Sequence, residues 1–395
     1  MLLRAVYKCN GENNMIIHDG NIFTEDGTFL KGTIYVAGEK IEKVNILSSD
    51  DQFGGKNDEM VIDAKQLYVL PGFVDIHMHG AMGIDFCTAG KNELEILEEY
   101  QAKNGITTIF PATMTLSEDD LGHIMGNVAK YSKNSMGVIS GIAMEGPFLS
   151  FKKRGAQDER YIRKPDASIF RALQEKSGNM ISQIAVAPEE EGALEFIESV
   201  SKETVVSVAH STADYDMAKC AFEKGATHVT HLFNGMEPFL HRAPGIVGAA
   251  YDTRDVFVEL ICDGVHIHPS VVRAMFKLFG SERICMISDS LSATGMEDGE
   301  YSLGGQNVLK SGNMATLLDG TIAGSVSNLY ECFVKVVKEM GVSLEEAVLS
   351  CTKTPAKSLN VDNKCGILKE RRNADILILD NDLNIKYVIK NGRII

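Results

Sequence analysis

The N-terminal part of the chain alternates short apolar runs with polar turn signals. Between Met15 and Leu47, β-prone residues are interrupted by Asp-Gly pairs and by Gly-Glu-Lys, which mark tight turns between antiparallel strands. No helical periodicity is visible in this stretch. The pattern predicts a small antiparallel β structure near the start of the chain.

From Asp63 onward, β-prone runs alternate with longer stretches of helical spacing. This alternation is typical of βα units around a parallel sheet. Eight β-prone runs can be counted, and eight is the number of strands that closes a (β/α)8 TIM barrel. They lie at residues 72–79, 106–113, 137–146, 181–188, 205–212, 228–234, 256–266 and 283–290. We therefore expect an α/β fold of the TIM barrel type.

Beyond the eighth run, residues 299–324 predict an inserted hairpin, because a Leu-Asp-Gly turn signal lies among β-prone residues. Two helical stretches follow. The tail, residues 374–395, returns to short β-prone runs with Asn-Asp and Asn-Gly turns. Both chain ends are therefore expected to form one small β-sandwich domain. We predict this domain at residues 1–69 and 360–395, and the catalytic barrel at residues 70–359.

The bulk composition argues against two classes of partner. The chain has 395 residues, of which 44% are hydrophobic and 24% are charged, and its formal net charge is -15. Because polyphosphates and anionic lipids attract basic protein surfaces, nucleic-acid and membrane partners are not expected. No apolar run approaches the roughly 18 residues of a membrane span, and the N-terminus lacks the apolar region of a signal peptide.

Eight cysteines are scattered along the chain without a Cys-X-X-Cys pair. They stand at positions 9, 87, 220, 262, 285, 332, 351 and 365. This scatter is typical of reduced, structural thiols and not of a disulfide framework. We therefore expect a cytoplasmic protein.

The first β-prone run of the barrel carries a His-X-His motif. In a strand, side chains alternate between two faces, so Asp75, His77 and His79 share one face while apolar residues occupy the other. Two imidazoles on alternate residues at a strand end can reach one divalent ion. Taken alone, the motif fits histidines held by hydrogen bonds in a core equally well.

Further metal-ligating residues fall at the ends of other runs. Glu145, His210, His231 and Asp289 lie at the ends of the third, fifth, sixth and eighth runs. Chemistry in TIM barrels gathers at the C-terminal strand ends, where these side chains would converge. Neutral imidazoles and ionised carboxylates suit Zn, Fe, Mn or Co. We predict a site for one or two divalent ions.

Such a site supports hydrolysis. A divalent metal lowers the pKa of bound water from about 15.7 toward about 7, which generates a nucleophile. Asp289 can then act as general base and afterwards as general acid, although an aspartate there could also cap the following helix. His266, after the seventh run, is not needed as a ligand and is free to polarise a carbonyl group. His268 is the weaker candidate for that role.

A separate group offers donors for an anionic oxygen. His241 and Arg242 supply cationic side chains, and Asn234 and Gly235 lie directly after the sixth run. The alternative interpretation is an ordinary solvated loop. The remaining histidines are expected to be structural or on the surface, namely His18, His123 and His228.

Over nearly the whole chain these motifs resemble the amidohydrolase superfamily and, within it, the N-acetylglucosamine-6-phosphate deacetylase family. The similar segments are PGFVDIHMHG, AMEGPFLS, VAHSTA, THLFNGM and SDS. In this family the third strand supplies a glutamate ligand, whereas dihydroorotase-like and urease-like members use a carboxylated lysine on the fourth. The fourth run here ends in AVAPEE and contains no lysine.

The resemblance implies a ligand set. Glu145, His210 and His231 would hold the main metal ion. Family members differ at the first strand, and some have lost the His-X-His motif and hold one ion. This chain keeps His77 and His79 and could hold two ions bridged by Glu145.

The resemblance also implies a substrate and a partner. The substrate would be N-acetyl-D-glucosamine 6-phosphate, with His266 polarising its acetamide carbonyl and with Asn234 and Gly235 helping to bind it. Arg242, together with His241, would meet the sugar phosphate from the neighbouring subunit of a homodimer.

Three alternatives remain open at this point. The same chemistry could act on N-acetylgalactosamine 6-phosphate, and another amidohydrolase reaction, on a cyclic amide or as a deaminase, is a second possibility. A catalytically inactive barrel is the third. Two departures from the family pattern, Gly235 in place of alanine and Thr-Pro-Ala-Lys at 354–357, do not touch the proposed chemistry.

Overall fold

The structure is a computed structural model that describes residues 14–46 and 60–395. Predictions for the first 13 residues, which include Cys9 and the expected lack of a signal peptide, lie outside the described residues. The chain forms two compact units. One lies within Met1–Gly72 and Asp362–Ile395, and the other spans Phe73–Val361.

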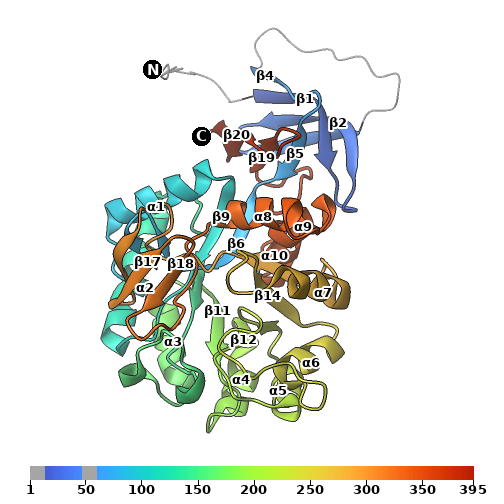
Figure 1. Cartoon of the computed structure of the whole chain (residues 1–395). Helices are drawn as coiled ribbons and strands as arrows, with labels where there is room; N and C mark the ends of the chain where they lie inside the picture. The colour runs from blue at the N-terminus through green and yellow to red at the C-terminus, as the bar shows by residue number, and fades with distance from the viewer. Residues whose placement is uncertain (1–13, 47–59) are drawn as a thin grey trace. The chain divides into compact units, whose positions relative to one another are not determined.

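The unit built from both chain ends contains a mixed β-sheet. Its described strands are joined in the order β21, β20, β19, β5, β1, β2 and β3, and β4 pairs with β1. In Figure 1 the blue strands from the start of the chain lie beside the red strands from its end. The bounds are β1 Asn14–Phe23, β2 Phe29–Ala37, β3 Lys40–Ile46, β4 Met60–Asp63, β5 Tyr68–Pro71, β19 Ile376–Leu379, β20 Ile385–Lys390 and β21 Arg393–Ile394.

Isoleucine is prominent in the core of this sheet unit. Ile17 of β1, Ile34 of β2 and Ile378 of β19 are fully buried. β-Branched side chains favour strands, because their restricted rotamers pack well on a pleated surface. The apolar runs at both ends of the sequence therefore meet in one core.

The larger unit is built around eight parallel strands, one in each of the eight β-prone runs. Strands β10 to β15 form one sheet, and β6 pairs with β9. Parallel bridges from Ile109 to Ile139 and from Ala112 to Ala143 connect the β9 and β10 regions. The bounds are β6 Phe73–Met78, β9 Ile106–Pro111, β10 Ile142–Met144, β11 Ile181–Val186, β12 Val205–Val208, β13 His228–Val229, β14 Phe257–Ile261 and β15 Ile284–Ile287.

Backbone hydrogen bonds also connect the last of these strands with the first. The amide of Asp289, just after β15, donates to the carbonyl of His77 in β6 at 3.0 Å. The amide of His79 donates to the carbonyl of Ser290 at 2.6 Å. These bonds bring together two strand ends that both carry predicted functional residues.

Helices of the larger unit lie around strands such as β11, β12 and β14 (Figure 1). In α7, Pro269 occupies the first turn, the His268 side chain caps the N-terminus, and Val272, Met275 and Phe276 are buried at helical spacing on one face. The bounds are α1 Lys91–Lys103, α2 Glu118–Tyr131, α3 Ala167–Lys176, α4 Ala193–Val200, α5 Tyr215–Glu223, α6 Gly245–Asp252, α7 Pro269–Phe279, α8 Leu329–Lys338, α9 Leu344–Cys351 and α10 Lys353–Ser358.

Short elements connect these strands and helices. They are β7 Gly80–Ala81, β8 Ile84–Asp85, η1 Ser132–Asn134, η2 Phe151–Lys153 and η3 Glu159–Tyr161.

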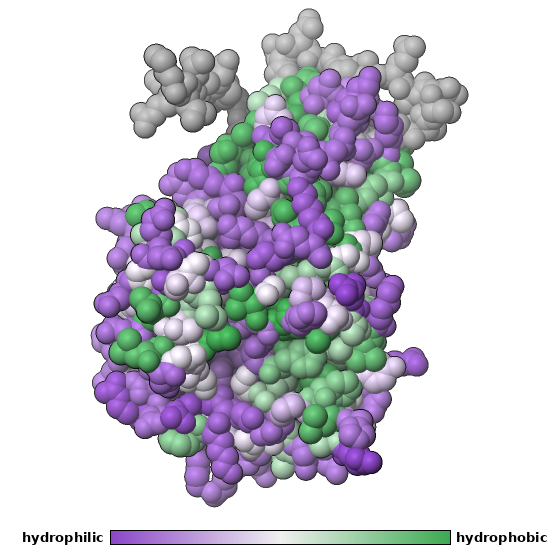
Figure 2. All heavy atoms as spheres, viewed as in Figure 1, coloured by the Kyte–Doolittle hydropathy of each residue, from purple (hydrophilic) through white to green (hydrophobic). Residues whose placement is uncertain are grey.

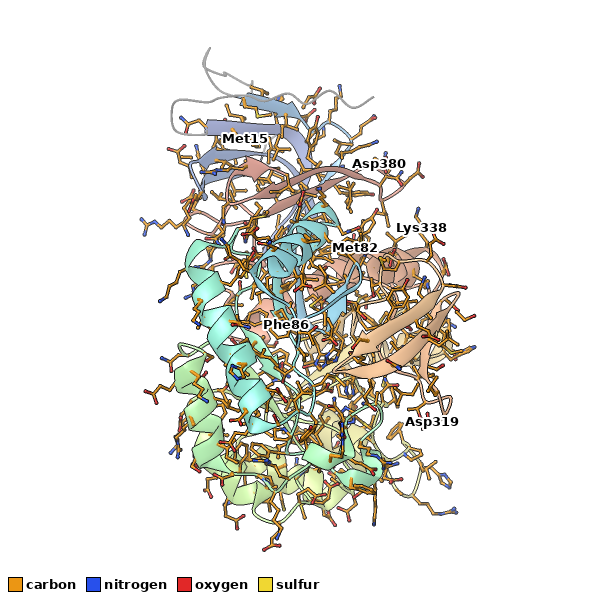
Figure 3. The ribbon with its side chains drawn as sticks, turned by 90° about the vertical axis from the view of Figure 1, so that its left-hand side faces the viewer. Met15, Met82, Phe86, Asp319, Lys338 and Asp380 are labelled. Atoms are coloured by element: carbon orange, nitrogen blue, oxygen red, sulfur yellow. The ribbon has the colours of Figure 1, made fainter. Side chains whose placement is uncertain are left out.

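The segment predicted as an inserted hairpin forms three antiparallel strands instead of two. A second turn separates its last two strands. Gly312 lies in this turn with a φ of 60°, a conformation that glycine adopts without strain. The turn after the third strand contains Asp319 (Figure 3), and Thr321 and Ile322 follow it. The bounds are β16 Gly299–Leu303, β17 Gln306–Ser311 and β18 Met314–Leu317.

The outer face drawn in Figure 2 mixes hydrophilic and hydrophobic residues, and hydrophilic residues cover much of it. Such mixing is ordinary for a protein surface exposed to water. Among the described residues, no helix is both long enough and apolar enough to cross a membrane.

Candidate metal centre and active site

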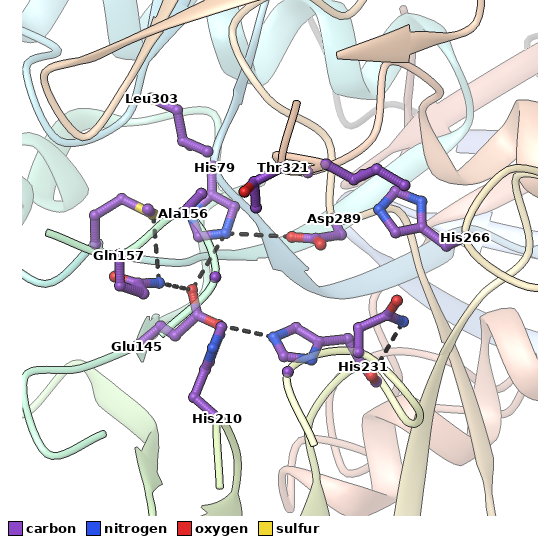
Figure 4. A pocket seen from close by; sticks show the side chains of 16 residues that line it. His79, Glu145, Ala156, Gln157, His210, His231, His266, Asp289, Leu303 and Thr321 are labelled. Atoms are coloured by element: carbon purple, nitrogen blue, oxygen red, sulfur yellow. Dashed lines mark hydrogen bonds and ion pairs between the residues drawn. The ribbon is translucent and has the colours of Figure 1, made fainter. Parts of the chain in front are cut away.

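All of the residues predicted at the strand ends except His77 line one cavity of about 290 Å³. Figure 4 shows Glu145 with His210 and His231 on one side and His79 and Asp289 on another. His266 lies beyond Asp289. The predicted residues in the cavity wall are His79, Glu145, His210, His231, Asn234, Gly235, His266 and Asp289.

The backbone turns sharply at three of these positions. Glu145 directly follows β10, and His210, His231 and Asp289 each stand two residues beyond their strand. The φ angles of the latter three are 44°, 30° and 50°, in the left-handed region that side chains other than glycine rarely adopt. Residues held in such conformations cluster at functional sites, where the surrounding structure compensates for the strain.

Glu145 is the centre of two possible ligand groups. Its Oε1 atom lies 2.9 Å from Nε2 of His210 and 2.9 Å from Nε2 of His231. On the other side, Nε2 of His79 lies 3.5 Å from Oε2, and Nε2 of His77 lies 3.8 Å from Oε1. In each group of three, the ligand atoms lie within 4.8 Å of one another, and every residue is buried.

Backbone carbonyls hold two of the imidazole rings. Nδ1 of His210 lies 2.8 Å from the carbonyl oxygen of Lys153, and Nδ1 of His79 lies 3.2 Å from that of Ala112. A carbonyl oxygen only accepts, so each Nδ1 carries the proton and each Nε2 faces Glu145. Metal-ligating histidines are commonly oriented in this way.

The charges of the cluster also suit a cation. Burial raises the pKa of Glu145, but the surrounding imidazoles outweigh burial and hold it well below its usual value. Burial lowers the pKa of His77 to about 4, so that ring is neutral at neutral pH. Nε2 of His77 has no hydrogen-bond partner within the described part of the chain. An ionised carboxylate beside a neutral, unpartnered imidazole nitrogen is a suitable donor set for a divalent metal.

Asp289 lies beside this cluster and is ionised. Its Oδ1 atom is 3.2 Å from Nε2 of His79 and 3.7 Å from Nε2 of His77. Burial raises the pKa of Asp289, but the hydrogen bond from His79 and the nearby imidazoles lower it below its usual value. Burial lowers the pKa of His79, yet Asp289 and Glu145 outweigh burial and raise it to about 9. The excess of negative charge therefore already attracts a proton, and it would attract a metal cation for the same reason.

His266 is oriented by the carboxylate of Asp263, which was not among the residues predicted from the sequence. Nδ1 of His266 lies 2.7 Å from Oδ2 of Asp263, whose other oxygen accepts from the amides of Val265 and His266. Burial raises the pKa of Asp263, but these contacts lower it to about 2. Burial lowers the pKa of His266, and Asp263 more than reverses that effect. His266 therefore faces the cavity as a ring that readily holds two protons.

Gln157 is a second residue that the sequence did not reveal. Its Nε2 donates to Oε2 of Glu145 at 2.7 Å, and its Oε1 accepts from the amide of Thr115 at 2.6 Å. The side chain is buried in the cavity wall. A glutamine twelve residues after the glutamate motif carries no recognisable signal, because only the folded loop brings it back to Glu145.

Gly235 lies in close contact with a predicted metal ligand, so, contrary to expectation, this departure from the family's alanine does touch the proposed site. It adopts a φ of 62°, and a Cβ atom added there would lie 2.8 Å from Nδ1 of His210. Asn234, next to it, donates through its side-chain amide to the carbonyl of His231 at 3.2 Å. These two residues therefore shape the cavity wall as well as offering donors to a ligand.

His241 and Arg242 do not reach this cavity. Both side chains are exposed, and Arg242 instead lines a second hollow with Asp214, Tyr215 and Pro244. Within one chain, the structure therefore separates His241 and Arg242 from the predicted metal ligands.

The remaining polar candidates are structural. Asp75 is buried and accepts from Ser288, with a side-chain contact of 2.5 Å. His228 is buried and stacks on Phe257, while His123 is exposed. His18 contacts Thr33 at 3.2 Å.

Comparisons with known proteins identify the family of this chain. A model of the amidohydrolase family matches residues 68–395. N-acetylglucosamine-6-phosphate deacetylase from Bacillus subtilis (strain 168) is 31% identical over 96% of this chain and 97% of that protein. Its counterpart from Lysinibacillus sphaericus is 36% identical over 83% of this chain and 85% of that protein. N-acetylgalactosamine-6-phosphate deacetylase from Escherichia coli O157:H7 is 30% identical, with coverages of 82% and 86%.

The fold of a solved relative is also similar. The structure of N-acetyl-D-glucosamine-6-phosphate deacetylase from Mycobacterium smegmatis, a mutant in complex with N-acetyl-D-glucosamine-6-phosphate, has a TM-score of 0.89 and 31% sequence identity. The similarity covers 97% of this chain and 99% of that one. The chain therefore belongs to the amidohydrolase family, among the N-acetylglucosamine-6-phosphate deacetylases.

Proposed function

We propose that this chain hydrolyses N-acetyl-D-glucosamine 6-phosphate to D-glucosamine 6-phosphate and acetate. The observation that carries the proposal is the convergence of Glu145, His210 and His231 beside Asp289 and His266 in one cavity. Relatives named for this reaction match nearly the whole chain.

The cavity needs a divalent cation for this reaction. Glu145, His210 and His231 would hold one ion, and His77 and His79 would hold a second ion that shares Glu145. The ligand types suit Zn, Fe, Mn or Co. A bound cation acts as a Lewis acid toward water and toward the amide carbonyl.

The residues beside the cluster handle protons. Ionised Asp289 accepts a proton from the attacking water and delivers it to the departing amine nitrogen. His266, held by Asp263, donates a hydrogen bond to the oxygen on which negative charge develops. Asn234 and Gly235 border the same cavity and are placed to contact the sugar.

We infer that the eight parallel strands close into a (β/α)8 barrel, with the cavity at its C-terminal end. The support is the pair of backbone hydrogen bonds from residues after β15 to residues of the β6 end. We also infer that the two compact units are separate domains. The sandwich form of the smaller domain stays a prediction.

We infer a homodimer in which His241 and Arg242 reach the neighbouring subunit's cavity and bind the substrate phosphate. Both lie outside the cavity of their own chain, and Phe239 and Leu240 beside them are 46% and 53% exposed. Exposed apolar residues next to cationic ones are typical of an interface. A cytoplasmic location stays a prediction.

The second candidate substrate is N-acetylgalactosamine 6-phosphate. A relative named for that reaction matches 82% of this chain at 30% identity. The two sugars differ at one hydroxyl group, so the distinction depends on single contacts in the cavity.

Acetate release, measured with metal analysis of the same sample, tests the proposal. The substrates are N-acetylglucosamine 6-phosphate, its galacto epimer and unphosphorylated N-acetylglucosamine. We expect chelator-sensitive hydrolysis, fastest with the first. Preference for the epimer would support the second candidate. No hydrolysis by a metal-loaded sample would favour another amide substrate or an inactive barrel.

A further inference from the structure

A second buried carboxyl group lies next to His77, one of the predicted metal ligands. Glu259 belongs to β14 and is fully buried. Its Oε1 atom accepts from Nε2 of Gln183 at 2.6 Å. Its Oε2 atom has no hydrogen-bond partner within the described part of the chain. Buried carboxylates normally have a partner for each oxygen, so this atom requires an explanation.

The unpartnered oxygen faces His77. Oε2 of Glu259 lies 3.5 Å from Nδ1 of His77, which is long for a hydrogen bond. The other ring nitrogen of His77, Nε2, also lacks a hydrogen-bond partner among the described residues, and it points toward Glu145 and Asp289. The ring thus lies between an unpartnered carboxylate oxygen and the predicted ligand cluster.

This arrangement differs from that of the neighbouring histidines. Nδ1 of His79 and Nδ1 of His210 face neutral backbone carbonyls. Nδ1 of His77 faces the side-chain carboxyl group of Glu259. A cation on the Nε2 side would make the ring a stronger donor to Glu259, and that hydrogen bond would make the ring a stronger ligand.

We propose that Glu259 is a positioning residue for the ion that His77, His79 and Glu145 would hold. It fixes the His77 ring through Nδ1, because Gln183 holds Oε1 and leaves Oε2 to face the ring. This inference rests on the proposed metal-dependent function. It assigns Glu259 to one of the two ligand groups, because its carboxyl group faces the ring of His77, whereas its contact with His231 is to the backbone.

Metal binding by the full-length protein tests this assignment. Metal-stripped wild type and Glu259→Gln are titrated with Zn²⁺ by calorimetry, and bound zinc is counted by elemental analysis. We expect two ions in the wild type. In Glu259→Gln we expect one ion at unchanged affinity and a second ion weakened by about 10 to 100-fold.

Asp75→Asn is the matched control. Asp75 is also a fully buried carboxylate on one of the parallel strands, but its oxygens accept from Ser288 and the His77 backbone amide, and no ion pair joins it to an imidazole ring among the described residues. We expect both ions to bind this variant normally. If Asp75→Asn also loses the second ion, replacing any buried carboxyl group on these strands is enough to weaken that ion, and the proposal is wrong.

A third variant covers the case in which Glu259→Gln does not fold. Glu259→Asp keeps the carboxyl group but shortens the side chain and moves it away from His77, so the second ion should bind more weakly than in the wild type. Wild-type affinity for both ions in Glu259→Gln, or a single ion in the wild type, would overturn the proposal.

The outcome is separable from that of the proposed function. A wild type that binds two ions, loses one with Glu259→Gln and releases no acetate would contradict the function and support the role of Glu259. A wild type that releases acetate with one ion per chain would support the function and overturn that role.

Discussion

At the scale of single residues, Asp289 lies where proton transfer is required. It stands within 3.2 Å of His79 and lines the cavity that also contains Glu145 and His266. Its left-handed backbone conformation, with a φ of 50°, places the carboxylate there. The nearby imidazoles keep it ionised, as a general base requires.

Asp289→Asn should lower turnover by about 100 to 10,000-fold, which is the usual contribution of general acid and base catalysis. The substitution keeps the shape of the side chain but removes the proton acceptor. Bound metal, measured on the same sample, should stay at the wild-type level. Full turnover by this variant would remove Asp289 from the mechanism.

Asp263→Asn should change the pH dependence of turnover. Asp263 raises the pKa of His266 against the lowering effect of burial, so without it the pKa of His266 falls. If His266 donates as a protonated ring, as proposed, activity should decline as pH rises through its pKa. The alkaline decline should therefore move to lower pH. The loss should stay below the roughly 100 to 1000-fold expected for removal of an oxyanion donor.

A pH–rate profile measures this shift. Asp319→Asn, in an exposed turn, is the control for a general change of charge. An alkaline limb at the wild-type position in Asp263→Asn would show that Asp263 does not act through His266.

Gly235→Ala should weaken metal binding. The new methyl group would lie 2.8 Å from Nδ1 of His210 at a φ of 62° and would displace that ring. Disturbing the support of a ligand typically lowers metal affinity by about 10 to 100-fold. Gly192→Ala is the control, since Gly192 has a φ of 83° but no atom within 4 Å of the added Cβ. Equal loss of metal in both variants would point to backbone strain alone.

At the scale of elements, the exposed segment before α6 governs the proposed subunit contact. Phe239, Leu240 and Arg242 are exposed, and Arg242 lies outside its own chain's cavity. A short loop can thus present apolar and cationic side chains together. Its role depends on whether Arg242 acts in the chain that carries it or in the neighbouring one.

Mixing Arg242→Ala with Asp289→Asn decides between these possibilities. Each variant alone should be nearly inactive. In a mixed dimer, the cavity with native Asp289 would receive native Arg242 from the partner, so turnover should return after subunit exchange. No recovery in mixtures that chromatography proves to contain mixed dimers would place Arg242 in its own chain's site or outside catalysis.

At the scale of the whole molecule, the proposed metal binding would be coupled to folding. Glu145, His210 and His231 are buried together, so a cation that binds only the folded chain stabilises it. Free metal at 100 times its dissociation constant adds about 2.7 kcal/mol. Chelation should therefore lower the unfolding temperature by several degrees, measurable by scanning fluorimetry. The shift should vanish in Glu145→Gln, and an equal shift in that variant would place the stabilising metal elsewhere.

The sequence alone predicted the eight parallel strands and half of the residues in the cavity wall. Strand periodicity put His77 and His79 on one face, and the ends of apolar runs marked Glu145, His210, His231 and Asp289. Such patterns are local and repeat along the chain, so they can be read before folding. Converging strand ends then imply one site, because parallel strands end at the same edge.

Only the tertiary structure decided which residues support that site. Gln157 binds Glu145 through a returning loop, Asp263 orients His266, and Glu259 faces His77 from β14. Glu259 lies within an apolar run and has no neighbouring motif. Whether these residues meet depends on the course of a loop and on the register of neighbouring strands. A short sequence pattern predicts neither. The sequence determined which residues could ligate a metal, and the packing of the strands and loops decided which side chains hold them in place.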